Sequence, residues 1–273
     1  MIAWILVIFA PVLGGLIYGV ERKLRARMQR RKGPPVIQPF YDFLKLIDKR
    51  PMIVHSLHAW LGVLHFLGMW LAVAVLLSGG DLLMAIFIHL LANSFLIVAA
   101  YSVQSVYSQL GGMRQLLAIL AYEPIFLLAG IGFYLLTGSF EGAAALQSDQ
   151  IPLFSLWALF LGVLIVLPAK LKKSPFDMAE AHQEIIGGAE IEYSGVFYEA
   201  LYTARWLEYV FAYAFIFLFG GANFWLGAAL AIGVFLAVTL VDNATARLNW
   251  RHTVVIALGL SLPLGFINLI GIG

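Results

Sequence analysis

"MIAWILVIFAPVLGGLIYGVERKLRARMQRRK", residues 1–32, joins twenty largely apolar residues to a dense basic cluster. An apolar run of about 20 residues is long enough to cross the hydrocarbon core of a bilayer as a helix. No basic segment precedes the run and no small-x-small site follows it, so we expect a retained membrane span and not a signal peptide. Seven Lys and Arg residues between 22 and 32 favour a cytoplasmic position for the C-terminal end of this span.

The whole chain is far more apolar than a soluble protein. Of its 273 residues, 62% are hydrophobic and 12% are charged, and the mean hydropathy is +0.91. Soluble domains carry about 25% charged residues. The sequence predicts eight spans, at 1–20, 60–78, 84–106, 116–137, 153–169, 201–220, 224–241 and 253–271. The expected fold class is an all-α polytopic membrane protein with a single transmembrane domain over 1–273.

Basic residues lie in every second predicted loop. All 17 Lys and Arg residues fall in four loops and the span ends beside them, at 21–59, 107–115, 170–200 and 242–252. The loops at 79–83, 138–152 and 221–223 contain none. The positive-inside rule therefore predicts cytoplasmic basic loops, both termini outside, and a multi-pass location in the plasma membrane.

The chain has no cysteine, which excludes disulfides and cysteine-ligated iron–sulfur clusters. His65 and His89 are predicted near the starts of two antiparallel spans, hence near opposite faces of the bilayer. They are expected at helix contacts or interfaces and not on a shared haem. We therefore expect no metal, no cofactor and no nucleic acid on this chain.

The first cytoplasmic loop, 21–59, has a defined shape. Gly33-Pro34-Pro35 predicts the end of the first helix, and 39–46 predicts an amphipathic helix. Attraction of basic residues to anionic lipid needs no such shape. We interpret the loop as a docking surface for a partner. Its basic residues are also expected to contact anionic lipid headgroups.

The loop "KSPFDMAEAHQEIIGGAEIEYSGVFYEA", residues 173–200, gathers acidic residues in a cytoplasmic position. Ser174 is a good N-cap and Gly187-Gly188 is a stop signal, so one short helix is predicted between them. Asp177, Glu180 and Glu184, spaced i, i+3 and i+7, would share one face of that helix. The alternative is an ordinary solvated acidic face.

Two further acids, Glu123 and Glu208, fall about two turns inside predicted spans. A charged side chain at mid-bilayer costs about 2.5–3.5 kcal/mol on insertion scales, so it usually faces the bundle interior and serves a function. The alternative is a neutral Glu held by one interhelical hydrogen bond. The acids predict a line of proton-carrying sites running inward from the cytoplasm: Glu123, Asp177, Glu180, Glu184, Glu190, Glu192 and Glu208.

Several motifs, in order over most of the chain, resemble one family. They are Glu21-Arg22-Lys23, Arg27-Met28-Gln29-Arg30-Arg31, Gly33-Pro34, Gln38-Pro39, Asp42 with Lys45, Ala121-Tyr122-Glu123, and Ser174-Pro175-Phe176-Asp177 through Glu192-Tyr193-Ser194-Gly195. This pattern resembles the membrane subunit beneath the redox arm of respiratory complex I, the NADH dehydrogenase subunit 1 / formate hydrogenlyase subunit 4 family. That family includes relatives in membrane-bound nickel–iron hydrogenases.

Two departures favour the hydrogenase branch. The quinone-reducing members usually extend the turn as Gly-Pro-Asn-Arg-Val-Gly-Pro, whereas this chain has the shorter 33–39 turn. The quinone branch also commonly has a carboxylate where His182 stands.

The resemblance implies a non-catalytic anchor and coupling subunit of an energy-converting, ferredoxin-linked nickel–iron hydrogenase. The nickel–iron centre and iron–sulfur clusters would lie on partners: the peripheral large and small subunits and an iron–sulfur subunit. Antiporter-like membrane subunits would move protons or sodium ions. The residues implied in docking of the peripheral arm are Arg22, Arg25, Arg27, Arg30, Arg31, Asp42 and Lys45.

Two other functions stay open. One is the quinone-site membrane subunit of a complex I-like NADH/quinone dehydrogenase, in which Glu21 and Arg22 would lie at a quinone cavity. The other is a stand-alone secondary transporter, which would be active alone in liposomes.

Overall fold

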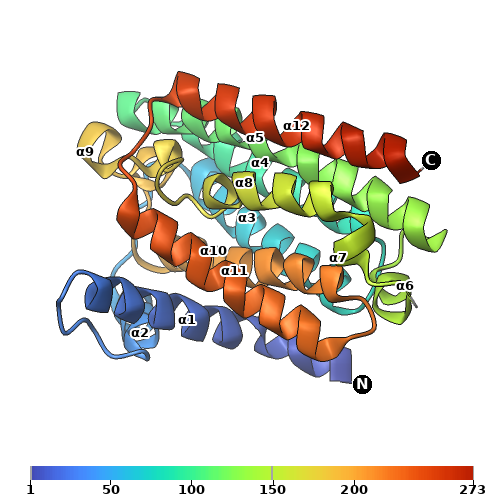
Figure 1. The fold of residues 1–273 in the computed structure, drawn as a ribbon. Coiled ribbons are helices and arrows are strands. Elements are labelled where there is room, and N and C mark those ends of the chain that lie inside the picture. Colours follow the sequence, from blue (N-terminus) through green and yellow to red (C-terminus); the bar gives the residue numbers. More distant parts are fainter. Residues whose placement is uncertain (1, 149, 273) are drawn as a thin grey trace.

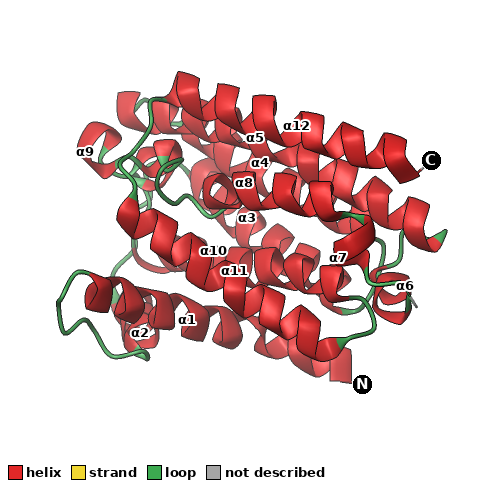
Figure 2. Cartoon of the chain, in the orientation of Figure 1, coloured by secondary structure: helices red, strands yellow, loops and turns green. Residues whose placement is uncertain are grey.

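The computed structural model describes residues 2–148 and 150–272. Within these residues the regular elements are helices, joined by short loops, and one isolated bridge pairs Asp81 with Glu141 (Figure 2). The α-helices are α1 Ile2–Met28, α2 Gln38–Asp48, α3 Ser56–Leu77, α4 Leu82–Ser102, α5 Val106–Thr137, α6 Gly142–Gln147, α7 Pro152–Ser155, α8 Trp157–Lys170, α9 His182–Ile185, α10 Gly195–Phe217, α11 Phe224–Ala244 and α12 Trp250–Ile272. The short 3₁₀ turns are η1 Met178–Glu180, η2 Gly188–Glu190 and η3 Leu218–Gly220.

Six of the described helices are long and apolar enough to cross a membrane: α1, α3, α4, α5, α11 and α12. This confirms an all-α polytopic membrane protein. The other two predicted spans fall on α8 and α10. Helix α8 has 14 residues, and α10 carries Glu199, Arg205 and Glu208 along its length.

The long helices lie side by side, with their connections gathered at the two ends of the bundle (Figure 1). The start of α1 and the end of α12 lie at the same end, together with α6 and α7. Helices α2 and α9 lie at the opposite end. The predicted basic and acidic loops therefore share one end of the molecule.

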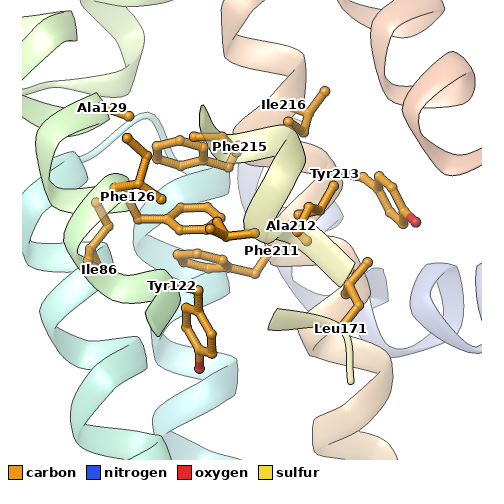
Figure 3. Packing of buried hydrophobic residues seen from close by; sticks show 14 of the residues in the cluster. Ile86, Tyr122, Phe126, Ala129, Leu171, Phe211, Ala212, Tyr213, Phe215 and Ile216 are labelled. Atoms are coloured by element: carbon orange, nitrogen blue, oxygen red, sulfur yellow. The ribbon is translucent and has the colours of Figure 1, made fainter. Parts of the chain in front are cut away.

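Helix α10 forms the centre of the bundle. The ring centroid of its Phe215 lies 5.0 Å from that of Phe126 and 6.1 Å from that of Phe133, both on α5. Figure 3 shows Phe126 and Phe215 packed with aliphatic side chains such as Ile86 and Ile216 between the helices. Aromatic pairs at such spacings add to the stability that their burial gives. Glu208 of α10 is buried in this bundle and Arg205 is half-buried, which explains how a long helix with charges fits a membrane protein.

The loop predicted at 107–115 is helical in the structure. Helix α5 already begins at Val106, and the preceding break lies at 103–105. Gly111 and Gly112 lie inside α5, where they allow close packing. A Cβ on Gly111 would stand 2.3 Å from the backbone nitrogen of Ala189. The helix therefore continues because its glycines let the acidic loop rest directly on its backbone.

The amphipathic helix predicted after Gly33-Pro34-Pro35 is confirmed as α2. Its rings Phe40 and Phe43 pack on Trp206 of α10, with centroids 5.4 and 6.0 Å away. A Cβ on Gly19 of α1 would lie 1.9 Å from the carbonyl oxygen of Val36, so the chain before α2 also lies tightly on α1. These contacts fix the first basic loop to the bundle.

Candidate functional site: a buried path of charged residues

A polar cavity of about 200 Å³ opens among α1, the segment after α8, the acidic loop and α10. Its charged lining residues are Arg25, Lys170, Lys172, Lys173, Asp177, Glu180, Glu190, Arg205, Glu208 and Asp242. Charges that are removed from lipid and paired with one another are typical of ion and proton pathways in membrane proteins. Most of these side chains belong to an inner, a middle or an outer cluster, and Arg25, Lys173 and Asp242 form a further group with Glu21.

The inner cluster joins Glu208 of α10, His89 of α4 and Lys170 of α8. The Glu208 carboxylate lies 2.8 Å from His89 Nε2 and 3.1 Å from Lys170 Nζ. Lys170 Nζ also lies 2.8 Å from His89 Nε2. All three residues are buried. A buried acid with two basic neighbours can remain ionised inside the membrane, because its charge is compensated at short range.

Three aromatic rings surround the Lys170 ammonium. Nζ lies 5.0 Å from the centroid of Tyr122, 4.9 Å from Phe126 and 4.8 Å from Phe211. A cation over a ring face in a desolvated site gains about 2 kcal/mol or more. The same rings pack into the hydrophobic centre (Figure 3), so the ammonium lies at the boundary between the polar cavity and the apolar core.

Glu123 of α5 is buried at 5% exposure next to Tyr122. Neither of its carboxyl oxygens has a hydrogen-bond partner among the described residues. The predicted alternative, a Glu held by one interhelical hydrogen bond, is therefore not what the structure shows. Glu123 directly follows Tyr122, whose ring centroid lies 5.0 Å from Lys170 Nζ, so this turn of α5 borders the inner cluster.

The middle cluster pairs two acids of the loop with two bases. Glu180 lies 2.9 Å from Lys172 Nζ and 3.0 Å from the Arg205 guanidinium, and Glu190 lies 2.8 Å from the same guanidinium. Burial alone would raise the pKa of Glu180, but Arg205 and Lys172 outweigh it and hold the pKa at about 2. Burial likewise lowers the pKa of Lys172, and Glu180 and Glu190 reverse that effect and raise it above the ordinary value.

The outer cluster ties the acidic loop to the α11–α12 connection and to α5. Arg247 donates two hydrogen bonds of 2.7 Å to Asp177, and these bonds raise the pKa of Arg247. Glu184 lies 2.6 Å from Arg114 and 3.6 Å from Arg247.

The prediction of one helix between Ser174 and Gly187 was wrong. The segment forms η1, α9 and η2 in turn, and Ala181 leaves helical geometry at ψ 79°. Asp177 and Glu184 pair with Arg247, while Glu180 pairs with Lys172 and Arg205, so the three acids do not share one helical face. Ion pairing with bases on other elements outweighs the local capping preference.

Glu21 and Arg25, on α1, are part of the protein interior. Glu21 accepts hydrogen bonds of 2.5 Å from both Lys173 and Tyr209, and 2.9 Å from Arg25. Arg25 pairs in addition with Asp242 of α11. Arg25, predicted to dock a partner, thus has its guanidinium engaged within the chain.

Arg22 pairs with Asp42 at 2.9 Å and lines a cleft with Tyr18, Lys45 and Tyr202. Glu21, predicted at the same cavity, is buried at 3% exposure and is not one of the residues that line this cleft. Among the predicted docking residues, the basic side chains that point to solvent are Arg27, Arg30, Arg31 and Lys45.

Glu192 is half-buried, and its charge acts on His58 of α3. It stands apart from the three clusters in the described contacts. The other six predicted acids all lie in or beside these clusters.

The basic partners were missed by sequence reasoning, which used them only to orient the chain. A signal was present for two of them, because Arg205 falls inside the predicted span 201–220 and Lys170 directly follows the span 153–169.

The prediction that His65 and His89 lie near opposite faces of the bilayer was also wrong. His65 Nδ1 is 2.8 Å from the carbonyl oxygen of Ala92, one turn after His89. No group of three or more described His, Asp or Glu side chains is arranged to hold a metal ion.

Comparisons with known proteins agree over the whole chain. The sequence model of the NADH dehydrogenase family matches residues 1–273. NADH-ubiquinone oxidoreductase chain 1 of Branchiostoma lanceolatum is 28% identical over 295 residues, which cover 94% of this chain and 94% of that protein. A subunit of the NADH-quinone oxidoreductase of Dehalococcoides mccartyi (strain CBDB1) is 27% identical over 303 residues, which cover 99% of this chain and 85% of that protein.

A solved structure shares the fold. A chain in the structure of the membrane-bound sulfane sulfur reductase (MBS), an archaeal respiratory membrane complex, superposes with a TM-score of 0.84 at 24% identity, covering 99% of this chain and 98% of that chain. With the family match over every residue, this chain belongs to the NADH dehydrogenase family and is a multi-pass membrane subunit of the complex I-like oxidoreductase type.

Proposed function

We propose that this chain is the coupling subunit of a complex I-like oxidoreductase, joining electron transfer in a peripheral arm to ion movement in the membrane. The observation that carries this proposal is the polar cavity whose charged lining continues from Arg25 and Asp242 down to Glu208. A buried row of alternating acids and bases can pass protons or transmit a change of charge between the arm and the membrane.

The orientation follows from the distribution of charge. The end of the bundle with α2 and α9 carries the basic loops and would face the cytoplasm, with both termini outside. Arg27, Arg30, Arg31 and Lys45 would then meet the peripheral arm from the cytoplasmic side. The whole chain, 1–273, would act as one membrane domain.

For the electron acceptor, the proposal is a membrane quinone. The relatives described above carry the names NADH-quinone and NADH-ubiquinone oxidoreductase. The cleft lined by Tyr18, Arg22, Asp42 and Tyr202 offers polar groups beside the apolar surface of α2. Glu21 would act behind this cleft, through Tyr209 and Lys173, and would not touch the quinone.

A second candidate is the ferredoxin-linked nickel–iron hydrogenase, favoured by the short turn at 33–39 and by His182. The nickel–iron centre and iron–sulfur clusters would then be held by the peripheral subunits, with antiporter-like subunits beside this chain. In both cases the acids predicted to carry protons keep the same role, and no cofactor is assigned to this chain.

The experiment is purification of the complex in mild detergent, followed by mass spectrometry and two activity assays. NADH-driven reduction of a short-chain ubiquinone is expected for the quinone acceptor. A nickel-containing large subunit, together with hydrogen formation from reduced ferredoxin, would instead identify the complex as the hydrogenase and exclude the quinone acceptor. A chain that purifies alone and transports a solute in liposomes would contradict the coupling role altogether.

The coupling role is tested with Glu123→Gln and Glu208→Gln. Both variants are expected to assemble and transfer electrons while the number of ions moved per electron falls about tenfold or more. The reason is that Gln has no carboxyl proton to pass on, and a positioned proton donor speeds a proton transfer about 10²–10⁴-fold. Proteoliposomes holding the complex give the ratio of ions moved to electrons transferred. Wild-type ratios in both variants would remove the relay.

A further inference from the structure

The two carboxyl groups inside the bundle are in opposite situations. Glu208 has a histidine nitrogen at 2.8 Å and the Lys170 ammonium at 3.1 Å. Glu123 is as deeply buried, yet its oxygens have no hydrogen-bond partner among the described residues. A buried charge without a partner is far more costly than a buried neutral group. In this arrangement Glu208 is the ionised carboxyl and Glu123 the neutral one.

Lys170 contacts one of the two carboxyl groups and borders the helix turn that carries the other. Its ammonium contacts Glu208 of α10 and lies over the ring of Tyr122, the residue that precedes Glu123 on α5. Because a lysine carries its charge on a flexible four-carbon stem, the ammonium can change partner without movement of a helix.

The surroundings of Lys170 suit such an exchange. The faces of Tyr122, Phe126 and Phe211 attract a cation but accept no proton from it. Each ring thus stabilises the ammonium over a range of positions, whereas a single fixed carboxylate partner would hold it in one. His89 Nε2 lies 2.8 Å from both Lys170 Nζ and Glu208, so this ring positions the two groups against each other.

We propose that Lys170 is a movable counter-ion that exchanges between Glu208 and Glu123 as one proton passes between these two carboxyl groups. In the first arrangement Lys170 pairs with ionised Glu208, and Glu123 carries the proton. In the second, Lys170 pairs with ionised Glu123, and Glu208 carries the proton. One O–H bond breaks and one forms, so the total charge of the three groups is the same in both arrangements. This inference rests on the coupling role proposed above.

The first test replaces the counter-ion. In the complex reconstituted in proteoliposomes, Lys170→Gln is expected to lower the number of ions moved per electron about tenfold or more while electron transfer continues. The matched control is Lys23→Gln, an exposed lysine of α1, which is expected to keep the wild-type ratio. A wild-type ratio in Lys170→Gln, alongside loss in Glu123→Gln and Glu208→Gln, would overturn the exchange and leave the coupling role standing. Wild-type ratios in all three variants would overturn both.

The second test needs no change at Lys170, so it still decides the matter if that variant fails to assemble. Infrared difference spectroscopy of the complex detects the C=O stretch of a protonated carboxyl group. The resting complex is expected to show such a band that disappears in Glu123→Gln and persists in Glu208→Gln. During turnover a second band is expected that depends on Glu208. A resting band that persists in Glu123→Gln, or a turnover band that persists in Glu208→Gln, would overturn the proposal.

Discussion

Single residues differed in how far the sequence could place them. Glu123 and Glu208 were recognisable as interior acids because a charge inside an apolar span is costly and is seldom kept without a function. Their partners were not, because a lysine at a span end, such as Lys170, fits the positive-inside rule whether or not its ammonium turns inward. Which way a side chain points depends on the rotation of its helix, and that rotation is set by packing with helices far away in sequence.

Glu180 gives a prediction on pH. Its pKa in the folded protein is about 2, below its ordinary value of 4.5, because Arg205 and Lys172 outweigh the effect of burial. Its ion pairs therefore stabilise the fold above about pH 4.5, and this contribution is lost as the pH falls from about 4.5 to about 2. Glu180→Gln is expected to be less stable than the wild type at neutral pH, by a margin that shrinks over this range. Thermal unfolding of both proteins in detergent at a series of pH values measures it, and a margin independent of pH would contradict the assignment.

Among the elements, the long helices were predictable and the loop structure was not. Six of the eight predicted spans correspond to helices that are long and apolar enough to cross a membrane, since a run of about 20 apolar residues has few other structures there. The other two fall on the shorter α8 and the charged α10. The acidic loop failed as a helix because Arg247 on one side and Lys172 with Arg205 on the other draw its acids in different directions. The segment at 107–115 failed as a loop because Gly111 and Gly112 allow close contact and do not break the helix.

Gly111 therefore carries a prediction on the support of the loop. Gly111→Ala would place a methyl group 2.3 Å from the nitrogen of Ala189 and 2.4 Å from Cα of Gly188, both backbone atoms of η2. Overpacking of this kind typically costs about 1–3 kcal/mol, and here it also displaces Glu190 from Arg205. The expected result is a lower unfolding temperature and weaker coupling. Gly233→Ala on α11 is the matched control, since a Cβ there meets nothing within 4 Å, and equal loss in both variants would show a general glycine effect.

At the scale of the whole molecule, the fold brings both ends of the chain to one side and the charged loops to the other (Figure 1). The charge count could predict this arrangement, because it depends on the number of spans and not on their packing. The charge count could not predict the order of the helices in space. Helix α10 lies at the centre because of the fit of its aromatic side chains. There its Glu208 meets His89 of α4 and Lys170 of α8, and its Arg205 meets Glu180 and Glu190 of the acidic loop.

The orientation itself is tested most directly through the absence of cysteine from the chain. Gln147→Cys at the end of α6 and Arg31→Cys after α1 each introduce one thiol at an exposed position, at opposite ends of the bundle. In intact cells a membrane-impermeant maleimide is expected to label residue 147 at once and residue 31 only after permeabilisation, since the wild-type chain gives no background. Equal expression of both variants is the control. The reversed labelling pattern would place the basic loops outside the cell. A peripheral arm docked there would have no access to a cytoplasmic electron donor, and this result would contradict the proposed direction of coupling.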